Sequence, residues 1–191
     1  MKYLGKLICA ALLAPAAVWA AGPEYTPDNK MTVPADYRSW VFLTSSLDLN
    51  YNTTATPGHH MLDNVFVDPA AYQGFLKTGT WPDKTMLIKE NRMAESAGML
   101  SKAGQFQTGV MNLEIHVKDE ARFPNGKWAF FVSSDGKAAG SLMPATANCY
   151  SCHQEHGVVD TTFVQFYPTL MPIAKDKGTL IADYLKEVQA K

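Results

Sequence analysis

A five-residue segment in the C-terminal quarter of the chain combines the residue types most suited to redox chemistry. Cys149 and Cys152 lie three positions apart, and His153 follows directly. This C-x-x-C-H spacing is typical of the attachment site of a c-type haem. The two thiols can add to the two vinyl groups of one porphyrin, and the next imidazole then lies beneath the iron. The spacing therefore predicts one covalently bound haem c, with His153 as the iron ligand.

Two other uses of paired cysteines compete with this interpretation. A thioredoxin-like redox pair would need a strand before the motif and a long helix from its first cysteine, whereas residues 144–148 predict a loop. A zinc site would need a fourth ligand, and only His156 lies nearby. We expect His156 to be a surface histidine or a neighbour of a haem propionate. A haem is therefore the favoured interpretation of the motif.

The first twenty residues have the three-part pattern of a secretory signal. Lys2 and Lys6 form a basic start, an apolar run follows, and Ala20 closes it with a small residue. The apolar run is short for a membrane span, which needs about 20 apolar residues. We therefore expect residues 1–20 to be a cleaved signal peptide and the protein to be periplasmic. Cleavage would also remove Cys9, so that only the two cysteines of the motif would remain.

The composition predicts one folded domain and no nucleic-acid partner. Hydrophobic residues make up 47% of the 191 residues and charged residues 18%, so the chain can bury a core. Lys and Arg number 17, against 18 Asp and Glu. This balance argues against the concentrated basic patch that nucleic acids require. We expect residues 21–36 to form an extended N-terminal arm and residues 37–191 to form the haem domain.

Alternation of apolar and polar residues predicts an α+β domain. Strands are expected at 40–47, 61–67, 85–93, 105–117 and 127–133. Asp68 is expected to cap a short helix that has Pro69 at its first position and ends at Gly79. Apolar residues recur at helical spacing in 161–170 and 180–188. The sum is an antiparallel β-sheet of about five strands with short helices, and with the haem motif in a C-terminal loop–helix segment.

Two expected strands carry polar residues whose faces can be assigned from alternation. Lys89 shares a face of its strand with Leu87 and Asn91, although a lysine on a strand is usually solvated. The next strand carries a polar row on one face, consisting of Asn112, Glu114, His116 and Lys118. For His116 and Lys118 we expect this row to face solvent.

Three further residues could reach the haem, namely His60, Met143 and Met171. His59 and His60 end a loop rich in Gly, Pro and Thr, where exposure is the default, but His60 could instead reach the haem edge. Met143 and Met171 are the methionines nearest to the motif and could supply a sixth iron ligand. Methionine more often fills gaps in a core. Ligation by either one would make the protein an electron carrier.

Segments spread over most of the chain resemble the cytochrome P-460 family. The most specific is residues 149–170, CYSCHQEHGVVDTTFVQFYPTL. The others are residues 65–69 followed by Tyr72, residues 77–79 followed by Lys89, and Lys118, Asp119, Arg122 and Phe123 before residues 128–130. A bare C-x-x-C-H motif occurs in many cytochromes, whereas this set in this order is far more specific.

The resemblance implies a small β-rich periplasmic homodimer with a five-coordinate haem and an open distal side. Two branches share this fold. In the P-460 proteins proper, a lysine is also cross-linked to the porphyrin, and the enzyme oxidises hydroxylamine. In the cytochromes c′-β the cross-link is absent, and an apolar distal pocket binds nitric oxide and similar gases. Lys89 matches the cross-linking position, whereas Asp63 and Asn64 stand where a basic residue is expected before Val65.

The resemblance favours a hydroxylamine-oxidising haem enzyme and a gas-binding cytochrome, and Lys89 tilts the choice toward the enzyme. Hydroxylamine would bind the open iron, lose protons to a nearby carboxylate and pass electrons through the haem to a small periplasmic acceptor. Glu114 and Asp119 match acidic positions of the family, and they are the first and second candidates for this base. The alternatives are a gas-binding cytochrome of the c′-β type and a simple electron-transfer cytochrome with a six-coordinate haem.

Overall fold

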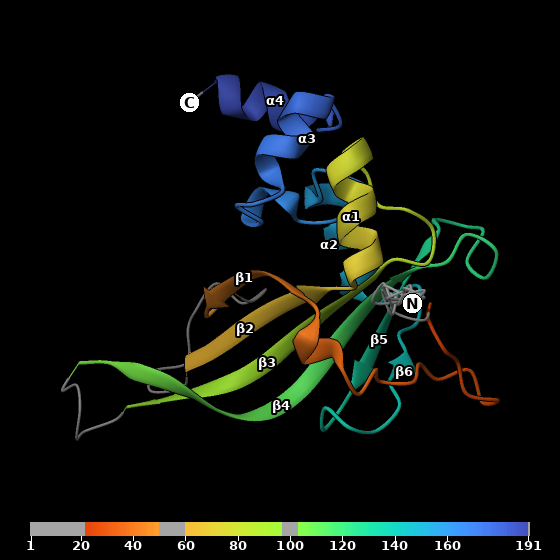
Figure 1. The fold of residues 1–191 in the computed structure, drawn as a ribbon, viewed down its shortest axis with the longest axis vertical. Coiled ribbons are helices and arrows are strands. Elements are labelled where there is room, and N and C mark those ends of the chain that lie inside the picture. Colours follow the sequence, from red (N-terminus) through yellow and green to blue (C-terminus); the bar gives the residue numbers. More distant parts are fainter. Residues whose placement is uncertain (1–21, 50–59, 97–102, 191) are drawn as a thin grey trace, which may run out of the picture.

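The computed structural model describes residues 22–49, 60–96 and 103–190, which form an antiparallel sheet with short helices (Figure 1). The strands are β1 Val41–Leu47, β2 His60–Val67, β3 Met86–Ser96, β4 Gln105–Lys118, β5 Trp128–Ser133 and β6 Ser141–Leu142. Their order in the sheet follows their order in the sequence. The predicted α+β class is confirmed, with six strands among the described residues. The added strand, β6, has two residues and is too short to produce an alternation pattern.

The first helix, α1 (Pro69–Thr78), forms where local signals predict it. The Asp68 carboxylate accepts a hydrogen bond from the Ala71 amide at 2.8 Å, which satisfies a free N–H group of the first turn. Gly79 ends the helix in the left-handed region, at φ 76°. The second oxygen of Asp68 accepts a hydrogen bond from the Met86 amide at 2.9 Å. The cap thereby also ties α1 to the start of β3.

The part of the chain after β6 contains the remaining α-helices. They are α2 Asn148–His156, α3 Met171–Lys177 and α4 Ala182–Gln189. Two 3-10 turns also form, η1 Tyr37–Ser39 before β1 and η2 Val164–Phe166 between α2 and α3. The helix expected at 180–188 is confirmed as α4 with its start displaced by two residues. Figure 1 shows α1 to α4 gathered on one side of the sheet, while the far end of the β3–β4 pair projects away from them.

The helix predicted at 161–170 is wrong. Asp160 and Thr161 have positive φ values of 52° and 59°, which an α-helix cannot accommodate. The chain then makes the single turn η2 and enters α3 with Pro172 in its first turn, where the missing N–H group is harmless. The apolar spacing that suggested a helix instead includes residues that pack into the core from irregular backbone, such as Tyr167 and Leu170.

Each face of the sheet carries its own hydrophobic core. The core under the helices includes Val67, Phe75, Leu87, Trp128, Val164 and Leu170. The core on the opposite face includes Met31, Trp40, Ile88, Leu113, Ile115 and Phe131. Met31 is completely buried, so the N-terminal segment from residue 22 onward packs on the sheet and closes the second core. Alternate residues of β3 enter different cores, as period-two geometry requires.

Strand register aligns cross-strand rows of side chains on the helix-covered face. Lys89 pairs with Val65 on one side and with Glu114 on the other. In the next row, His116 pairs with Phe130. Because directly opposite residues in an antiparallel sheet point the same way, these side chains gather over one area of the sheet. The site is built on that area.

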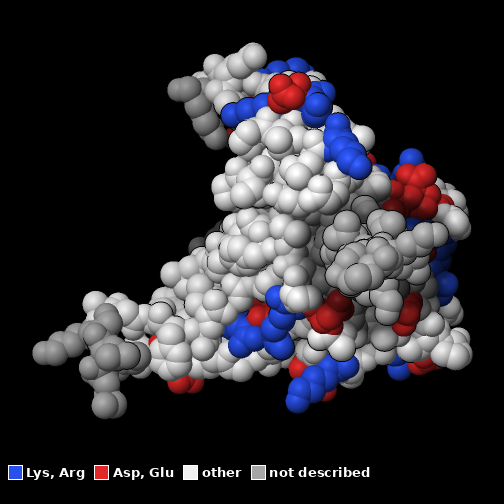
Figure 2. Space-filling view, in the orientation of Figure 1, with Lys and Arg blue, Asp and Glu red and all other residues white. Residues whose placement is uncertain are grey.

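Charged groups of both signs lie together on the surface of the sheet. On the face drawn in Figure 2, basic side chains lie beside acidic ones, in keeping with ion pairs such as Arg38–Glu90 at 2.8 Å. In the described part of the chain, none of the helices has the length and apolar character needed to cross a bilayer.

Candidate haem-binding site

A cavity of about 540 Å³ lies between the helix-covered face of the sheet and the segment from α2 to η2. Strands β1 to β5 form one wall, and α2 and the residues that follow it form the other. Much of the lining is apolar and includes Val65, Leu87, Phe130, Phe163 and Tyr167. Its volume falls within the range of sites that bind cofactors and small ligands, about 300–1,000 Å³.

The cysteine motif lies on α2, on the wall that faces the sheet. The expected loop extends only to Ala147, and the helix begins at Asn148. Cys152 lines the cavity, and neither Cys149 nor Cys152 is in a disulfide. Burial raises the pKa of the Cys149 thiol, whereas a thioredoxin-like nucleophile needs a lowered thiol pKa. The helical motif therefore lacks the electrostatics of a redox-active thiol pair.

His153 lines the cavity, and one of its ring nitrogens is already hydrogen-bonded within the protein. Its Nδ1 atom lies 2.7 Å from the carbonyl oxygen of Thr161, so Nδ1–H donates and the Nε2 lone pair is left for a metal. Burial lowers the pKa of His153 and favours the neutral imidazole that binds metals. A hydrogen bond to the second nitrogen is also what fixes the orientation of a metal-binding histidine. His153 is therefore prepared to act as an iron ligand.

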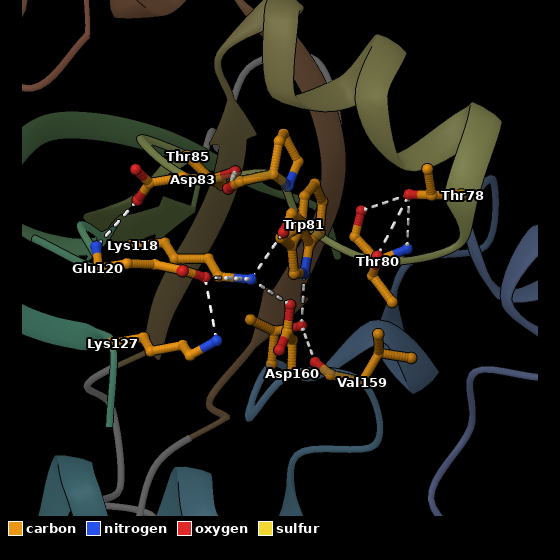
Figure 3. A network of polar contacts seen from close by, with 12 residues as sticks. Thr78, Thr80, Trp81, Asp83, Thr85, Lys118, Glu120, Lys127, Val159 and Asp160 are labelled. Carbon is orange, nitrogen blue, oxygen red and sulfur yellow. Dashed lines mark hydrogen bonds and ion pairs between the residues drawn. The ribbon is translucent and has the colours of Figure 1, made fainter. Parts of the chain in front are cut away.

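The Thr161 carbonyl is held by a tight turn that includes Asp160 and Thr161, both of which have positive φ. The Thr162 hydroxyl donates to the Val159 carbonyl at 2.6 Å and accepts from the Trp81 indole at 2.8 Å (Figure 3). These bonds fix the turn beside the start of β3. Because the same turn presents the Thr161 carbonyl to His153, the packing around Trp81 sets the direction of the imidazole.

Lys118 fastens this turn to the sheet. Its ammonium donates to the Trp81 carbonyl and to the Asp160 carboxylate, both at 2.7 Å (Figure 3). Only 6% of Lys118 is exposed, so the prediction of a solvent-facing position is wrong. A buried ammonium requires a charged partner and hydrogen-bond acceptors. Asp160 and the Trp81 carbonyl supply both, and neither can be recognised from the alternation of β4 alone.

His116 is also buried, against the expectation of a solvent-facing row. Its ring stacks on Phe130 with centroids 4.0 Å apart and an interplanar angle of 11°, and it packs against Trp128. The His116 and His153 ring centroids are 4.7 Å apart. Burial holds the pKa of His116 well below its ordinary value, so its ring is neutral. Neutral aromatic surroundings of this kind help to keep His153 uncharged.

Three charged side chains form a polar wall on the sheet side of the cavity: Asp63, Lys89 and Glu114. The Lys89 ammonium lies 3.4 Å from both carboxylate oxygens of Glu114 and 3.9 Å from Oδ1 of Asp63. Asn91 donates a hydrogen bond to Glu114 at 2.9 Å. Lys89 is therefore a partly exposed residue that lines the same cavity as Cys152 and His153.

Asp63 was recognised in the sequence only as a departure from the family pattern. In the structure it is 1% exposed, on β2, and it lines the cavity. Burial raises its pKa to about 6, an effect that the charge of Lys89 opposes. The apolar alternation of β2 gives no signal for this position, since the residue points into a polar part of the cavity.

Asp119 lies away from the cavity lining, which argues against its predicted role as second base. It accepts hydrogen bonds from Lys84, from the Tyr25 hydroxyl at 3.2 Å and from the Arg122 amide at 3.0 Å. Burial alone would raise the pKa of Asp119, but these partners, Lys84 foremost, bring it below its usual value. A stable carboxylate with this many donors ties the N-terminal segment to the end of β4.

The other predicted candidates divide between the cavity and the rest of the fold. His156 lines the cavity rim with an exposed side chain. His60 instead contacts Asp48, with Nδ1 2.7 Å from a carboxylate oxygen. Among the described residues, neither Met143 nor Met171 lines the cavity. His59 lies outside the described residues. No group of three or more described His, Cys, Asp or Glu residues is arranged to hold a metal ion by itself, which gives no support to a zinc site.

The residues that surround the cavity fit a haem. An oriented, neutral histidine lies beside two thiols on one wall, and the apolar lining suits a porphyrin face. The fold and the site together define a haem protein of the cytochrome class.

The family model for Cytochrome P460 matches residues 34–164. The chain therefore belongs to the cytochrome P460 family, as the resemblance of its motifs implies. No curated protein sequence matches it.

Proposed function

We propose that this protein is a periplasmic mono-haem c-type cytochrome that oxidises hydroxylamine or a related small nitrogen compound. Thioethers to Cys149 and Cys152 would attach the haem, and His153 would bind its iron. The observation that carries the proposal is the position of Lys89, whose ammonium reaches the polar wall of the cavity that His153 lines. This position supports a covalent bond between the lysine nitrogen and the porphyrin ring.

The haem, when bound, supplies the electron transfer and the open coordination position, and the protein supplies orientation and proton transfer. Glu114 is the proposed base. Its side chain is 39% exposed, so a proton taken from an N–H or O–H group of the substrate can pass on to solvent. Asn91 holds Glu114 by the hydrogen bond at 2.9 Å and keeps one carboxylate oxygen in place. Hydroxylamine would be oxidised, and a small periplasmic acceptor protein would be reduced.

A gas-binding protein of the c′-β type is the second candidate. The observation that favours it is the apolar part of the cavity, to which Val65, Leu87 and Phe163 belong. Such a lining would accept nitric oxide without protonation chemistry. A six-coordinate electron carrier is less well supported, since neither Met143 nor Met171 lines the cavity among the described residues.

A comparison of Lys89→Leu with the wild type distinguishes the two candidates. In the wild type, the reduced spectrum should have a strongly red-shifted Soret band, because a bond to a meso carbon interrupts conjugation and distorts the ring. Lys89→Leu should shift the spectrum toward that of an ordinary c-type haem, abolish most hydroxylamine oxidation and retain nitric oxide binding. The matched control is Lys77→Leu, at the end of α1 and away from the cavity.

Mass spectrometry of proteolytic fragments tests the bond itself. The peptides that contain Lys89 and Cys152 should stay joined through the haem in the wild type and separate in Lys89→Leu. Separate peptides in the wild type, together with an ordinary c-type spectrum, would favour the gas-binding candidate.

We also propose that the protein is exported and forms a homodimer. Export is supported by the signal-like residues 1–20, which lie outside the described residues. Dimerisation is supported by the family resemblance and by large apolar side chains that one chain leaves exposed on β1 and β4, namely Phe42, Leu47, Phe106 and Met111. Light scattering should give twice the mass of the mature chain, and the mass of one chain would count against the dimer.

A further inference from the structure

One oxygen of the Asp63 carboxyl group has no hydrogen-bond partner among the described residues. Asp63 is 1% exposed, and its Oδ2 atom accepts a hydrogen bond from Ser46 at 3.2 Å. Its Oδ1 atom is buried and accepts none. The nearest cation is the Lys89 ammonium, 3.9 Å away, which is too far for a hydrogen bond. Buried polar atoms almost always have a partner, so an unpartnered oxygen on a residue that lines a cavity points to a ligand.

The charges around Asp63 come from three elements and do not balance. Lys89 on β3 is the one described cation in the polar wall, and it is shared with Glu114 on β4. Asp48, just beyond the end of β1, adds a further negative charge to the surroundings of Asp63. Burial is the largest influence on Asp63 and raises its pKa to about 6, with Glu114 and Asp48 adding to the rise. Asp63 can therefore gain and lose a proton near neutral pH.

We propose that Asp63 binds the small nitrogen ligand directly through Oδ1 and exchanges a proton with it. The ligand class is a small nitrogen compound with an N–H or O–H group, so the proposal rests on the proposed function for the presence of that ligand in the cavity. In the exchange, the ligand's N–H or O–H bond breaks, a new O–H bond forms on Asp63, and the electron pair stays on the ligand. The step moves a proton and involves no oxidation.

The two carboxyl groups of the polar wall thus have different tasks. Glu114 is partly exposed and can release protons to solvent, whereas Asp63 is buried and can exchange them only with a group inside the cavity or with its neighbours in the wall. The apolar residues of the cavity offer a ligand no comparable hydrogen bond. Asp63 would therefore favour protic ligands over gases such as nitric oxide.

The proposed bond between Lys89 and the haem would strengthen this role. A nitrogen bonded to a conjugated ring carbon is much less basic than an alkylammonium group, so Lys89 would lose its positive charge. That charge is the first influence that lowers the pKa of Asp63. Asp63 in the cross-linked protein would then keep its proton to higher pH and act as a hydrogen-bond donor to the bound ligand.

Ligand titrations of the ferric holoprotein test the proposal with hydrazine as the protic probe and nitric oxide as the aprotic one. Asp63→Asn has nearly the same size but cannot titrate. Above the midpoint of the Asp63 titration it should weaken hydrazine binding about tenfold or more, because the hydrogen bond to the ionised carboxylate is lost. The wild-type affinity for hydrazine should depend on pH with a midpoint at pH 6 or above, and Asp63→Asn should remove this dependence. The affinity for nitric oxide should not change. Hydrazine itself also titrates, but its protonation affects all variants equally and cancels in the comparison.

A second variant and a direct readout guard against a merely structural effect. Ser46→Ala removes a hydrogen bond that lowers the Asp63 pKa, so it should move the midpoint upward without abolishing it. Infrared difference spectra between low and high pH should contain the band of a protonated carboxyl group that is absent in Asp63→Asn. The proposal fails if Asp63→Asn leaves hydrazine binding and this band unchanged, or weakens both probes equally. A wild type that binds hydrazine as expected but does not oxidise hydroxylamine would overturn the proposed function alone.

Discussion

The Nδ1 atom of His153 lies 2.7 Å from the carbonyl oxygen of Thr161, and this bond joins the haem motif to the rest of the fold. Thr161 follows Asp160 in a turn where both residues have positive φ. The turn is held by Lys118, which comes from β4. The orientation of His153 therefore depends on a lysine distant in sequence from the motif.

Lys118→Met should destabilise the protein and loosen His153. The variant removes both hydrogen bonds of the ammonium and leaves the Asp160 carboxylate without its cation, at a cost of about 1–3 kcal/mol. Urea unfolding followed by circular dichroism measures this cost, and the haem reduction potential should change as well. Lys127→Met is the control, since its exposed pair with Glu120 is worth at most about 1 kcal/mol. Equal losses of stability in the two variants would contradict the role of Lys118.

Gly157→Ala should disrupt the haem site through a backbone clash. A Cβ atom at this position would lie 2.4 Å from the carbonyl carbon of Thr161 and 2.6 Å from the carbonyl oxygen of His153. Both are backbone atoms, and they cannot move aside without breaking the hydrogen bond between Nδ1 of His153 and the carbonyl oxygen of Thr161. The ferric spectrum should become heterogeneous, and ligand affinity should fall. Gly109→Ala on β4 is the matched control, because its Cβ would meet nothing within 4 Å.

Covalent attachment predicts that the haem stays with the polypeptide after denaturation. In acid and organic solvent, the haem of the wild type should remain on the chain, because thioether bonds to Cys149 and Cys152 survive these conditions. Replacing both cysteines with Ala should allow complete extraction. Free extraction of the haem from the wild type would show that the thioether assignment is wrong.

Asp63 should make stability fall as pH rises. Its carboxyl titrates near 3.8 in an unfolded chain and at about 6 in the fold, so the folded state binds more protons in this interval. Below pH 3.8 both states are protonated and no cost arises. Above pH 6 the buried carboxylate costs at most about 3 kcal/mol, the difference between the two pKa values. Asp63→Asn should therefore raise the melting temperature well above pH 6 and leave it unchanged below pH 3.8. An equal effect at both pH values would contradict the titration of Asp63.

Features set by neighbouring residues could be predicted from the sequence, whereas features set by distant contacts could not. Helix α1 was predictable because Asp68, Pro69 and Gly79 act on the backbone next to them. The burial of His116 and Lys118 was not, because alternation on β4 assigns a face and says nothing of what covers it. Phe130 and Asp160 cover them, and both come from other parts of the chain.

The site could be predicted only in part for the same reason. The spacing of Cys149, Cys152 and His153 is a local pattern and identifies one wall of the cavity. Lys89 and Glu114 could be placed only through the family resemblance, and they do line the cavity. Asp63 carries no local pattern, and its importance follows from burial and from an unpartnered oxygen that only the folded structure reveals.

The two walls of the cavity come from parts of the chain that meet only in the folded protein, and this would set the order in which the proposed bonds to the haem form. Thioethers need just the five consecutive residues of the motif, so they can form on an extended chain. A bond to Lys89 requires that β3 has joined the sheet and that α2 has docked over it. Such a bond would be a permanent covalent mark of correct assembly. The fraction of haem-bearing molecules that lack the Lys89 bond would then measure how many chains received a haem but never reached the native packing.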